Sequence, residues 1–208
     1  MARSFLLQTQ NPEGGVNGRH AMGGRAIDHP GLAQPECPGC HQPAPVIFKL
    51  DFEDPPLREL GAWSGLLYGF LCGNCQPSGF EPVVFMDYSD RARPSYWPET
   101  ALECFDDQRV EYELTPLFLR PYSLPVSHPG YSWARVGGEP FVSQTLERPE
   151  CPKCLSPMRF LLQLSESFDY RPRQVSPAGT YGELGFGALH CWFGCHDCSV
   201  VASFELLE

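Results

Sequence analysis

Apolar and polar residues alternate along two stretches of the chain, and each stretch follows a pair of cysteines. In the range 46–53 the apolar positions of one parity are Val46, Phe48, Leu50 and Phe52. In the range 159–165 they are Phe160, Leu162 and Leu164. Side chains of a β-strand point alternately to its two faces, so a period of two is typical of a half-buried strand. We therefore predict a strand in each range, with these residues on its buried face.

Shorter apolar segments predict further strands, at 66–72, 83–86, 109–114, 189–195 and 200–206. The 22 prolines and 20 glycines favour many turns over long helices. One short helix is predicted over 98–105, because a proline in the first turn and acidic residues near the N-terminal end suit a helix start. The first dozen residues are predicted to be poorly ordered. The fold should therefore be mainly β, with α+β as the alternative.

The chain contains an internal duplication. A shift of 114 residues places Gly23-Gly24 on Gly137-Gly138 and segment 35–40 on 149–154. The last cysteine pairs of the two copies match at a shift of 123, so the second copy carries nine additional residues. Prolines and glycines place this insertion in a loop at 169–187. We therefore predict two tandem β-rich modules packed into one body. The first spans residues 1–118, with an N-terminal arm and a connecting segment, and the second spans 119–208.

Eight of the ten cysteines form four C-x-x-C pairs. The pairs are Cys37/Cys40 and Cys72/Cys75 in the first copy, and Cys151/Cys154 and Cys195/Cys198 in the second. In a reducing compartment this spacing is typical of zinc ribbons, because each pair makes a knuckle turn and two knuckles complete a tetrahedral shell. We predict one Zn²⁺ per copy, two per chain. Both should be structural, since four protein thiolates leave no open coordination position. A metal shared between copies would need longer loop closures.

Three histidines lie beside the knuckles and leave the ligand set open: His41, His190 and His196. Any of them could replace a thiolate, since imidazole is also a zinc ligand. Eight cysteines already complete two sets of four, so we expect these histidines to be solvated or to support the ligands from outside the shell.

Two cysteines remain outside the C-x-x-C pairs. Cys191 could be an additional ligand of the last pair, but the strand alternation puts it in the place of Tyr68 and favours a buried core cysteine. Cys104 has no partner at metal spacing, so we predict that it is packed or unused rather than a nucleophile.

Charge limits the partners. Lys and Arg number 15 against 25 Asp and Glu, which gives a formal net charge of −10. Phosphate backbones and anionic lipids repel such a protein, so we expect no nucleic acid or membrane partner, and a charge-driven protein partner should be basic. No apolar run approaches the roughly 18 residues of a membrane span, and the first eleven residues do not resemble a secretory segment. We expect a cytoplasmic protein with reduced thiols.

The second copy also carries longer strings: Val136-Gly137-Gly138-Glu139-Pro140, Cys151-Pro152-Lys153-Cys154 and Pro157-Met158-Arg159-Phe160-Leu161-Leu162-Gln163-Leu164. With these strings, residues 120–208 resemble the bacterial YwqG-like family of unknown function, and distantly the domain of eukaryotic programmed cell death protein 2. Residues 16–90 share the resemblance only through the internal repeat. The resemblance implies binding rather than catalysis, because the eukaryotic relatives are thought to chaperone a basic ribosomal protein.

The chain departs from this family directly after each first knuckle. The family usually has glycine there, whereas this chain has His41 and Leu155. A left-handed backbone conformation at this position would be strained for leucine, because its Cβ crowds the neighbouring carbonyl.

Charge, closed metal sites and resemblance together predict a non-enzymatic protein-binding module. It would act as a chaperone or adaptor for a basic client, or as an inhibitor of the immunity type. No G-x-S-x-G, Walker A or H-E-x-x-H string argues for an enzyme. The alternative is a thiol oxidoreductase, or a redox or metal sensor, that uses the C-x-x-C pairs and has freely titrating thiols without zinc.

Overall fold

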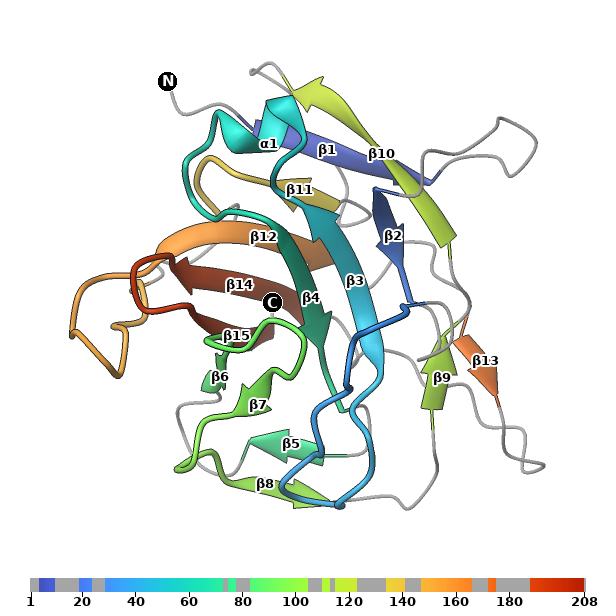
Figure 1. The fold of residues 1–208 in the computed structure, drawn as a ribbon, viewed down its shortest axis with the longest axis vertical. Coiled ribbons are helices and arrows are strands. Elements are labelled where there is room, and N and C mark those ends of the chain that lie inside the picture. Colours follow the sequence, from blue (N-terminus) through green and yellow to red (C-terminus); the bar gives the residue numbers. More distant parts are fainter. Residues whose placement is uncertain are drawn as a thin grey trace.

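A computed structural model gives the fold of the chain (Figure 1). It describes residues 4–9, 19–23, 29–72, 75–77, 83–104, 110–112, 115–122, 134–140, 147–165, 172–174 and 188–207. Within these ranges the protein is mainly β, as predicted, and α1 (Pro55–Arg58) is the one α-helix. No helix among the described residues has the length and apolar character that a membrane crossing requires.

Eleven strands form one large sheet with the order β4-β3-β2-β10-β1-β11-β12-β14-β15-β6-β7, and every neighbouring pair is antiparallel. In that order the strands are β4 (Leu66–Phe70), β3 (Val46–Asp51), β2 (His20–Met22), β10 (Thr115–Tyr122), β1 (Ser4–Thr9), β11 (Ala134–Val136), β12 (Arg159–Ser165), β14 (Ala188–Cys195), β15 (Val200–Leu207), β6 (Val83–Asp87) and β7 (Ser95–Tyr96). Two further pairs stand apart: β5 (Cys75–Pro77) with β8 (Leu102–Cys104), and β9 (Val110–Tyr112) with β13 (Pro172–Gln174).

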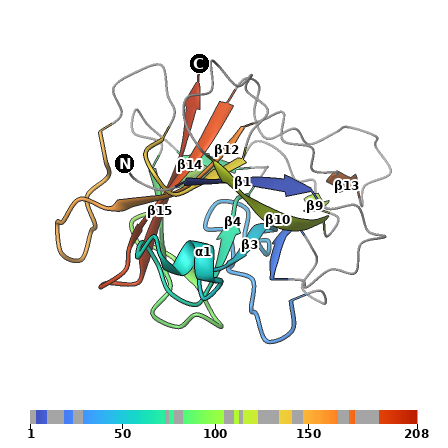
Figure 2. The same cartoon turned by 90° about the horizontal axis from the view of Figure 1, so that it is seen from above.

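The large sheet folds over itself, so that β3 and β4 cross the face of β12 and β14 (Figures 1 and 2). The rings of Phe48 on β3 and Trp192 on β14 meet edge to face, with centroids 5.1 Å apart. The hydroxyl of Tyr88, just after β6, donates a hydrogen bond to the backbone carbonyl of Tyr68 on the edge strand β4. This bond links the two ends of the sheet and gives the β4 edge a partner.

The main core fills the space between the crossed layers. It unites Phe48 and Leu50 of β3 with Leu162 of β12 and Trp192 of β14, all fully or almost fully buried. A second apolar cluster covers the opposite face of β12, β14 and β15, with Phe193 at its centre. The second copy is therefore buried on both faces of its sheet, which explains its nearly continuous apolar strands.

The duplication is confirmed at the level of strand register. Met22 lies opposite Phe48 in the first copy, and Val136 lies opposite Leu162 in the second, at the same shift of 114 residues. The β3–β4 and β12–β14 pairings also correspond residue by residue, with the second strands offset by 123. The additional residues of the second copy must then lie between Ser165 and Leu189, and most of the predicted insertion at 169–187 is outside the described residues.

Both copies also share a β-bulge, between Val46 and Phe48 and between Phe160 and Leu162. A bulge adds a residue and changes which side chains share a face. Phe160 therefore leaves the face of Leu162 and packs against Phe193, with ring centroids 5.5 Å apart, while Leu161 enters the main core. Our assignment of Phe160 to the same face as Leu162 was wrong for this reason.

Two other expectations are corrected by long-range strand pairing. The predicted helix over 98–105 is absent from the described residues up to 104, because Leu102–Cys104 pair with β5 instead. Part of the N-terminal segment, expected to be poorly ordered, forms β1 between β10 and β11. Strand β6 exists as predicted but pairs with β15 of the other copy. The division into modules at residues 118 and 119 stays a prediction, and those two residues lie in β10.

Candidate metal centres

The structure brings the eight predicted cysteines together in the two predicted sets of four. Within each set, all four Sγ atoms lie within 4.8 Å of one another. We call the set of the first copy site 1 and the set of the second copy site 2. Their members are Cys37, Cys40, Cys72 and Cys75 in site 1, and Cys151, Cys154, Cys195 and Cys198 in site 2. Both are zinc-ribbon-like sites built from two knuckles.

The sulfur spacing fits a tetrahedral metal ion. A zinc–sulfur bond of about 2.3 Å implies sulfur–sulfur edges of roughly 3.8 Å in a regular tetrahedron. The Sγ atoms of Cys40 and Cys72 are 3.6 Å apart in site 1, and those of Cys154 and Cys195 are 3.7 Å apart in site 2. A disulfide would need about 2.05 Å, and none of these cysteines is disulfide-bonded.

The first knuckle of each site has the same backbone hydrogen bonds. The N–H of Cys37 donates to the carbonyl five residues later at 2.8 Å, and that of Cys151 does so at 3.0 Å. The N–H groups of His41 and Leu155 donate to the backbone carbonyls of Cys37 and Cys151 at 2.9 and 2.8 Å. His41 and Leu155 have φ angles of 59° and 58°, the left-handed region that favours glycine. The strain expected for Leu155 is therefore present.

The second knuckle of site 1 follows β4, and the second knuckle of site 2 begins at the last residue of β14. In site 2 the knuckle is also the turn of a hairpin, since Cys195 ends β14 and Val200 begins β15. Ser199 closes this turn with a φ of 53° and donates its N–H to the carbonyl of His196 at 3.3 Å. In site 1 the chain leaves through β5, which pairs with β8 rather than with β4.

Crowding of the thiols separates their pKa values within site 1. A hydrogen bond with the thiol of Cys72 lowers the pKa of Cys37 to about 5. Burial, followed by hydrogen bonds with neighbouring thiols, raises the pKa of Cys75. Four sulfurs this close cannot all carry a negative charge unless a cation lies among them. A bound divalent metal would supply that charge and deprotonate its ligands.

In site 2, too, the pKa values of neighbouring thiols are moved in opposite directions. Hydrogen bonds from the backbone N–H and the hydroxyl of Ser156 lower the pKa of Cys154 to about 6. The hydrogen bond with Cys154 raises the pKa of Cys198 to about 12, with burial as the second cause. Each donor set therefore contains a thiol of lowered pKa, Cys37 or Cys154, and a thiol of raised pKa, Cys75 or Cys198. Four sulfur donors suit a soft or borderline metal ion.

Strand β8 covers site 1, which the sequence did not indicate. Leu102 packs against the cysteines. A Cβ placed on Gly39 would lie 2.9 Å from the carbonyl oxygen of Leu102 and 3.0 Å from the Sγ of Cys75, so only glycine fits beneath β8. Cys104 lies directly opposite Cys75 in the β5–β8 pair, and the thiols of these two residues interact. The spacing of the cysteines carried no signal for this neighbour, because strand pairing alone creates it.

Site 2 is held by charged and polar contacts with the first copy. Lys153, between two of its ligands, forms an ion pair with Asp87 at 2.8 Å and donates to the hydroxyl of Ser89 at 3.0 Å. Its ammonium also donates to the backbone carbonyl of Cys198 at 3.2 Å. Lys153 therefore joins both knuckles of site 2 to the end of β6.

A second contact lies on the other knuckle of site 2. His196 hydrogen-bonds through Nε2 to the hydroxyl of Ser64 at 3.1 Å and lies edge-on to Trp63. The guanidinium of Arg91 lies 5.7 Å from the ring centroid of Trp63 and hydrogen-bonds to Ser64. The loop around residues 61–65 of the first copy is thus attached to site 2.

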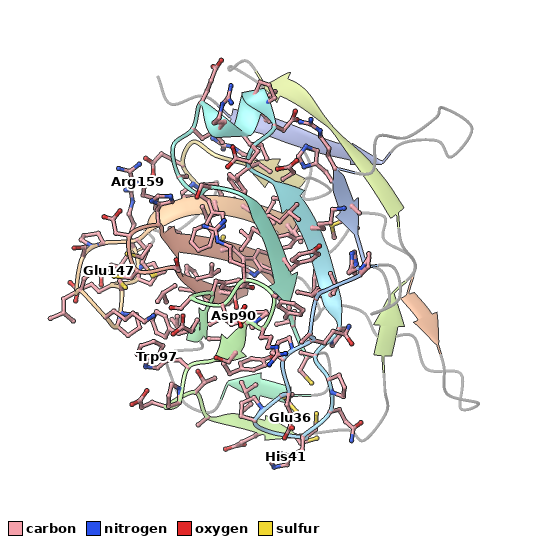
Figure 3. All side chains as sticks on the ribbon, in the orientation of Figure 1. Glu36, His41, Asp90, Trp97, Glu147 and Arg159 are labelled. Atoms are coloured by element: carbon pink, nitrogen blue, oxygen red, sulfur yellow. The ribbon has the colours of Figure 1, made fainter. Side chains whose placement is uncertain are left out.

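The sequence leaves three histidines as possible metal ligands. Among the described residues, none of them belongs to either set of four sulfurs. His41 pairs with Glu36 at 2.9 Å, and both side chains point outward at the tip of the molecule beside site 1 (Figure 3). His196 is exposed and contacts Ser64, as described above. His190 is buried in β14, away from both sets.

Cys191 is fully buried, in the place of Tyr68, and belongs to the cluster around Phe193. This position agrees with a core cysteine rather than a ligand of site 2. Cys104 is exposed. Of the two predicted alternatives, packed or unused, the first is therefore wrong and the second stays a prediction.

Comparison with known proteins gives a distant similarity. The chain is 24% identical over 180 residues to the uncharacterised protein YpfL of Salmonella typhimurium. The aligned region covers 80% of this chain and 38% of that protein. The chain thus spans well under half of its relative's length. No family model and no solved structure matches the chain. The resemblance to the YwqG-like family and to programmed cell death protein 2 is not confirmed by these comparisons and stays a prediction.

Proposed function

We propose that this protein is a zinc-stabilised, non-enzymatic protein-binding module with one structural zinc ion in site 1 and one in site 2. The observation that carries the proposal is the pair of complete four-sulfur sets, each with all four Sγ atoms within 4.8 Å of one another. Four protein thiolates leave no position for water or substrate, so such an ion would stabilise the fold rather than catalyse a reaction. Thiolate sets of this kind are typical of zinc in proteins whose thiols stay reduced, which supports a cytoplasmic location.

The zinc ions would hold the turns that follow β4 in site 1 and β14 in site 2. His41, which follows Cys40 in the sequence, lies at the tip of the molecule, and Glu147, four residues before Cys151, lies at its side (Figure 3). Among the described residues no helix packs against either site, and at site 1 Leu102 is the apolar residue that packs against the cysteines, whereas site 2 borders the cluster around Phe193. Metal binding in small modules contributes folding free energy directly, so we expect both regions to depend on it.

A binding role is supported by the surface of site 2. Leu155 is 71% exposed and keeps a left-handed backbone conformation, although glycine would satisfy this turn without strain. Exposed acidic groups accompany it in the knuckles, at Glu150 and Asp197. An exposed leucine in a site whose knuckles also carry exposed carboxylates suits a partner that offers an apolar pocket within a basic surface. We propose that a basic client or target protein binds there.

The experiment is affinity capture from cell extract at low and moderate salt, followed by mass spectrometry. Leu155→Gly removes the exposed side chain and suits the backbone, so it should keep two zinc ions and reduce capture of the partner by about tenfold, as loss of a central apolar contact does. The matched control is His41→Gly at the corresponding position of site 1, which should leave capture unchanged. A partner captured equally by both variants would exclude this surface, and no enriched partner would count against the binding role.

The alternative, a thiol oxidoreductase, makes the opposite prediction for the cysteines. Its C-x-x-C thiols would react quickly with a thiol reagent in the native protein, without prior removal of metal. We expect instead that the eight site cysteines react only after a chelator is added. Thiol counting on the native protein with and without chelator distinguishes the two functions.

A further inference from the structure

Site 1 has a fifth thiol beside it. Cys104 on β8 is exposed, whereas its neighbour Cys75 is a buried member of the sulfur set. The two residues are direct cross-strand partners in the β5–β8 pair, and their side chains interact. Directly opposite residues of an antiparallel pair point to the same face, so this contact follows from the register and not from a chance rotamer.

The backbone geometry also suits a covalent bond. Opposite Cα atoms in an antiparallel pair are about 4.5–5.5 Å apart. A disulfide spans Cα separations of roughly 4.4–6.8 Å. Cys75 and Cys104 are therefore within bonding reach without movement of the strands. We propose that Cys104 is an oxidation site whose disulfide with Cys75 removes one ligand from site 1 and releases its metal ion.

The chemistry needs a hydroperoxide as the oxidant, and hydrogen peroxide serves as the example. The exposed Cys104 sulfur attacks one peroxide oxygen, the O–O bond breaks, and Cys104 becomes a sulfenic acid with loss of hydroxide. The Cys75 thiolate then attacks the Cys104 sulfur and expels the second oxygen as hydroxide. One proton from the Cys104 thiol converts one hydroxide to water. The two sulfurs lose two electrons in total, and the two peroxide oxygens gain them.

Site 2 provides an internal control. The remaining cysteine of the second copy, Cys191, is fully buried in the core and is not accessible to an oxidant in the folded protein. In the part of the chain that the structure describes, the exposed cysteine of site 2, Cys154, is itself a proposed zinc ligand, and no additional exposed thiol lies beside the site. A thiolate bound to zinc reacts more slowly with an oxidant than a free thiol, so site 2 should release its metal more slowly than site 1. The inference rests on the proposed presence of zinc in both sites.

The test is zinc release from the purified full chain under hydrogen peroxide, followed with a zinc-binding dye. We expect one zinc ion per chain in a fast phase and the second in a slower phase. Cys104→Ser should slow the fast phase by about tenfold or more, because the accessible sulfur is gone. Peptide mapping without reductant should find the Cys75–Cys104 disulfide, and dithiothreitol with added zinc should restore two ions per chain.

Glu103→Ser is the matched variant, since it changes the adjacent exposed residue of β8 and points away from Cys75. It should release zinc like the unmodified chain. An equal fast phase in Cys104→Ser, or a Cys104 thiol that remains alkylatable after zinc is released, would overturn the inference. A purified protein without zinc would instead contradict the proposed function, so the two failures are distinguishable.

Discussion

Site 1 and site 2 have the same knuckle geometry but different surroundings. Their first knuckles share backbone hydrogen bonds and left-handed residues at corresponding positions. Site 1 is covered by the short strand β8, which belongs to neither of the duplicated strand sets. Site 2 instead contacts the other copy through Lys153 and His196. The duplication thus preserves the ligands, while the residues between the ligands determine what each site is attached to.

The position between the first two ligands illustrates this difference. Gly39 in site 1 and Lys153 in site 2 correspond at the shift of 114 residues. Gly39 allows β8 to lie against the sulfurs, whereas Lys153 reaches Asp87 and Ser89 of the first copy. We infer that site 1 stabilises a local cover and that site 2 stabilises the interface between the copies.

The largest expected effect separates the two sites by loss of one ligand each. Cys195→Ser should lose both zinc ions and most of the folded structure, because it breaks the β14–β15 turn inside the large sheet and the attachment of the first copy. Cys72→Ser should lose one zinc ion and keep the large sheet, because β5 and β8 form a sheet of their own. Structural zinc contributes up to about 10–16 kcal/mol in small modules, comparable with the whole stability of a domain.

Native mass spectrometry gives the zinc count for each variant, and amide hydrogen exchange shows which strands remain protected. Equal loss of structure in both variants would remove the proposed difference between the sites. A Cys195→Ser protein that keeps the zinc ion of site 1 and a folded β3–β4 pair would contradict the claim that the large sheet depends on site 2.

The next effect concerns buried polarity in the corresponding strands β4 and β14. His190 occupies the place of the buried Leu67, and its Nε2 atom has no hydrogen-bond partner among the described residues. Burial lowers the pKa of His190 from its ordinary 6.5 to about 4. Between these two pH values the unfolded chain binds a proton that the folded chain does not. The folded protein should therefore lose stability as the pH falls from about 6.5 to 4, by roughly 3 kcal/mol in total.

His190→Leu should remove this loss and be at least as stable at pH 7.5. Urea unfolding at pH 7.5 and pH 5 gives the free energy of unfolding of the variant and of the unmodified chain. The difference between the two chains isolates the contribution of His190, because protonation of the site thiols affects both chains alike. A His190→Leu variant with the same loss of stability on acidification would show that His190 is not the group responsible.

A smaller effect tests the corresponding residues Gly39 and Lys153. Gly39→Ala should displace β8 and lower the stability of site 1 by about 1–3 kcal/mol, as overpacking does. Lys153→Ala should lower the stability by about 1 kcal/mol, because its ion pair with Asp87 is only partly buried. Competition with a zinc chelator measures the change at each site. A Gly39→Ala variant that loses zinc from site 2 first would contradict the assignment.

The smallest effect concerns the strained residues after the first knuckles. Leu155→Gly and His41→Gly should each change the stability by less than about 1 kcal/mol, because relief of left-handed strain offsets the greater freedom of the unfolded chain. Thermal unfolding of both variants, each with two zinc ions bound, checks this. Loss of a zinc ion in either variant would mean that the side chain, and not only the backbone, supports the knuckle.

Much of the ligand arrangement follows from local sequence. The C-x-x-C pairs, the period-two strands and the shift of 114 residues predicted which cysteines gather, because knuckles and neighbouring strands form from residues close in the chain or repeated in order. The turn conformation at Leu155 was also predictable, since a knuckle requires it whatever residue is present.

Long-range pairing was not predictable in the same way. Strand β6 adds to β15 of the other copy, and Leu102–Cys104 pairs with β5 although its local sequence favours a helix start. The shared bulge moved Phe160 to the other face, and no glycine marked it in the sequence. Each of these depends on which edge a strand meets after folding, which residue patterns within one strand do not encode.

The central claim is that two sulfur-ligated metal ions complete this fold. The most direct measurement is the metal content of the purified chain together with X-ray absorption at the zinc edge. We predict about two zinc ions per chain, each with four sulfur neighbours at about 2.3 Å. A folded protein without metal, with all eight site thiols open to titration or joined in disulfides, would contradict the account.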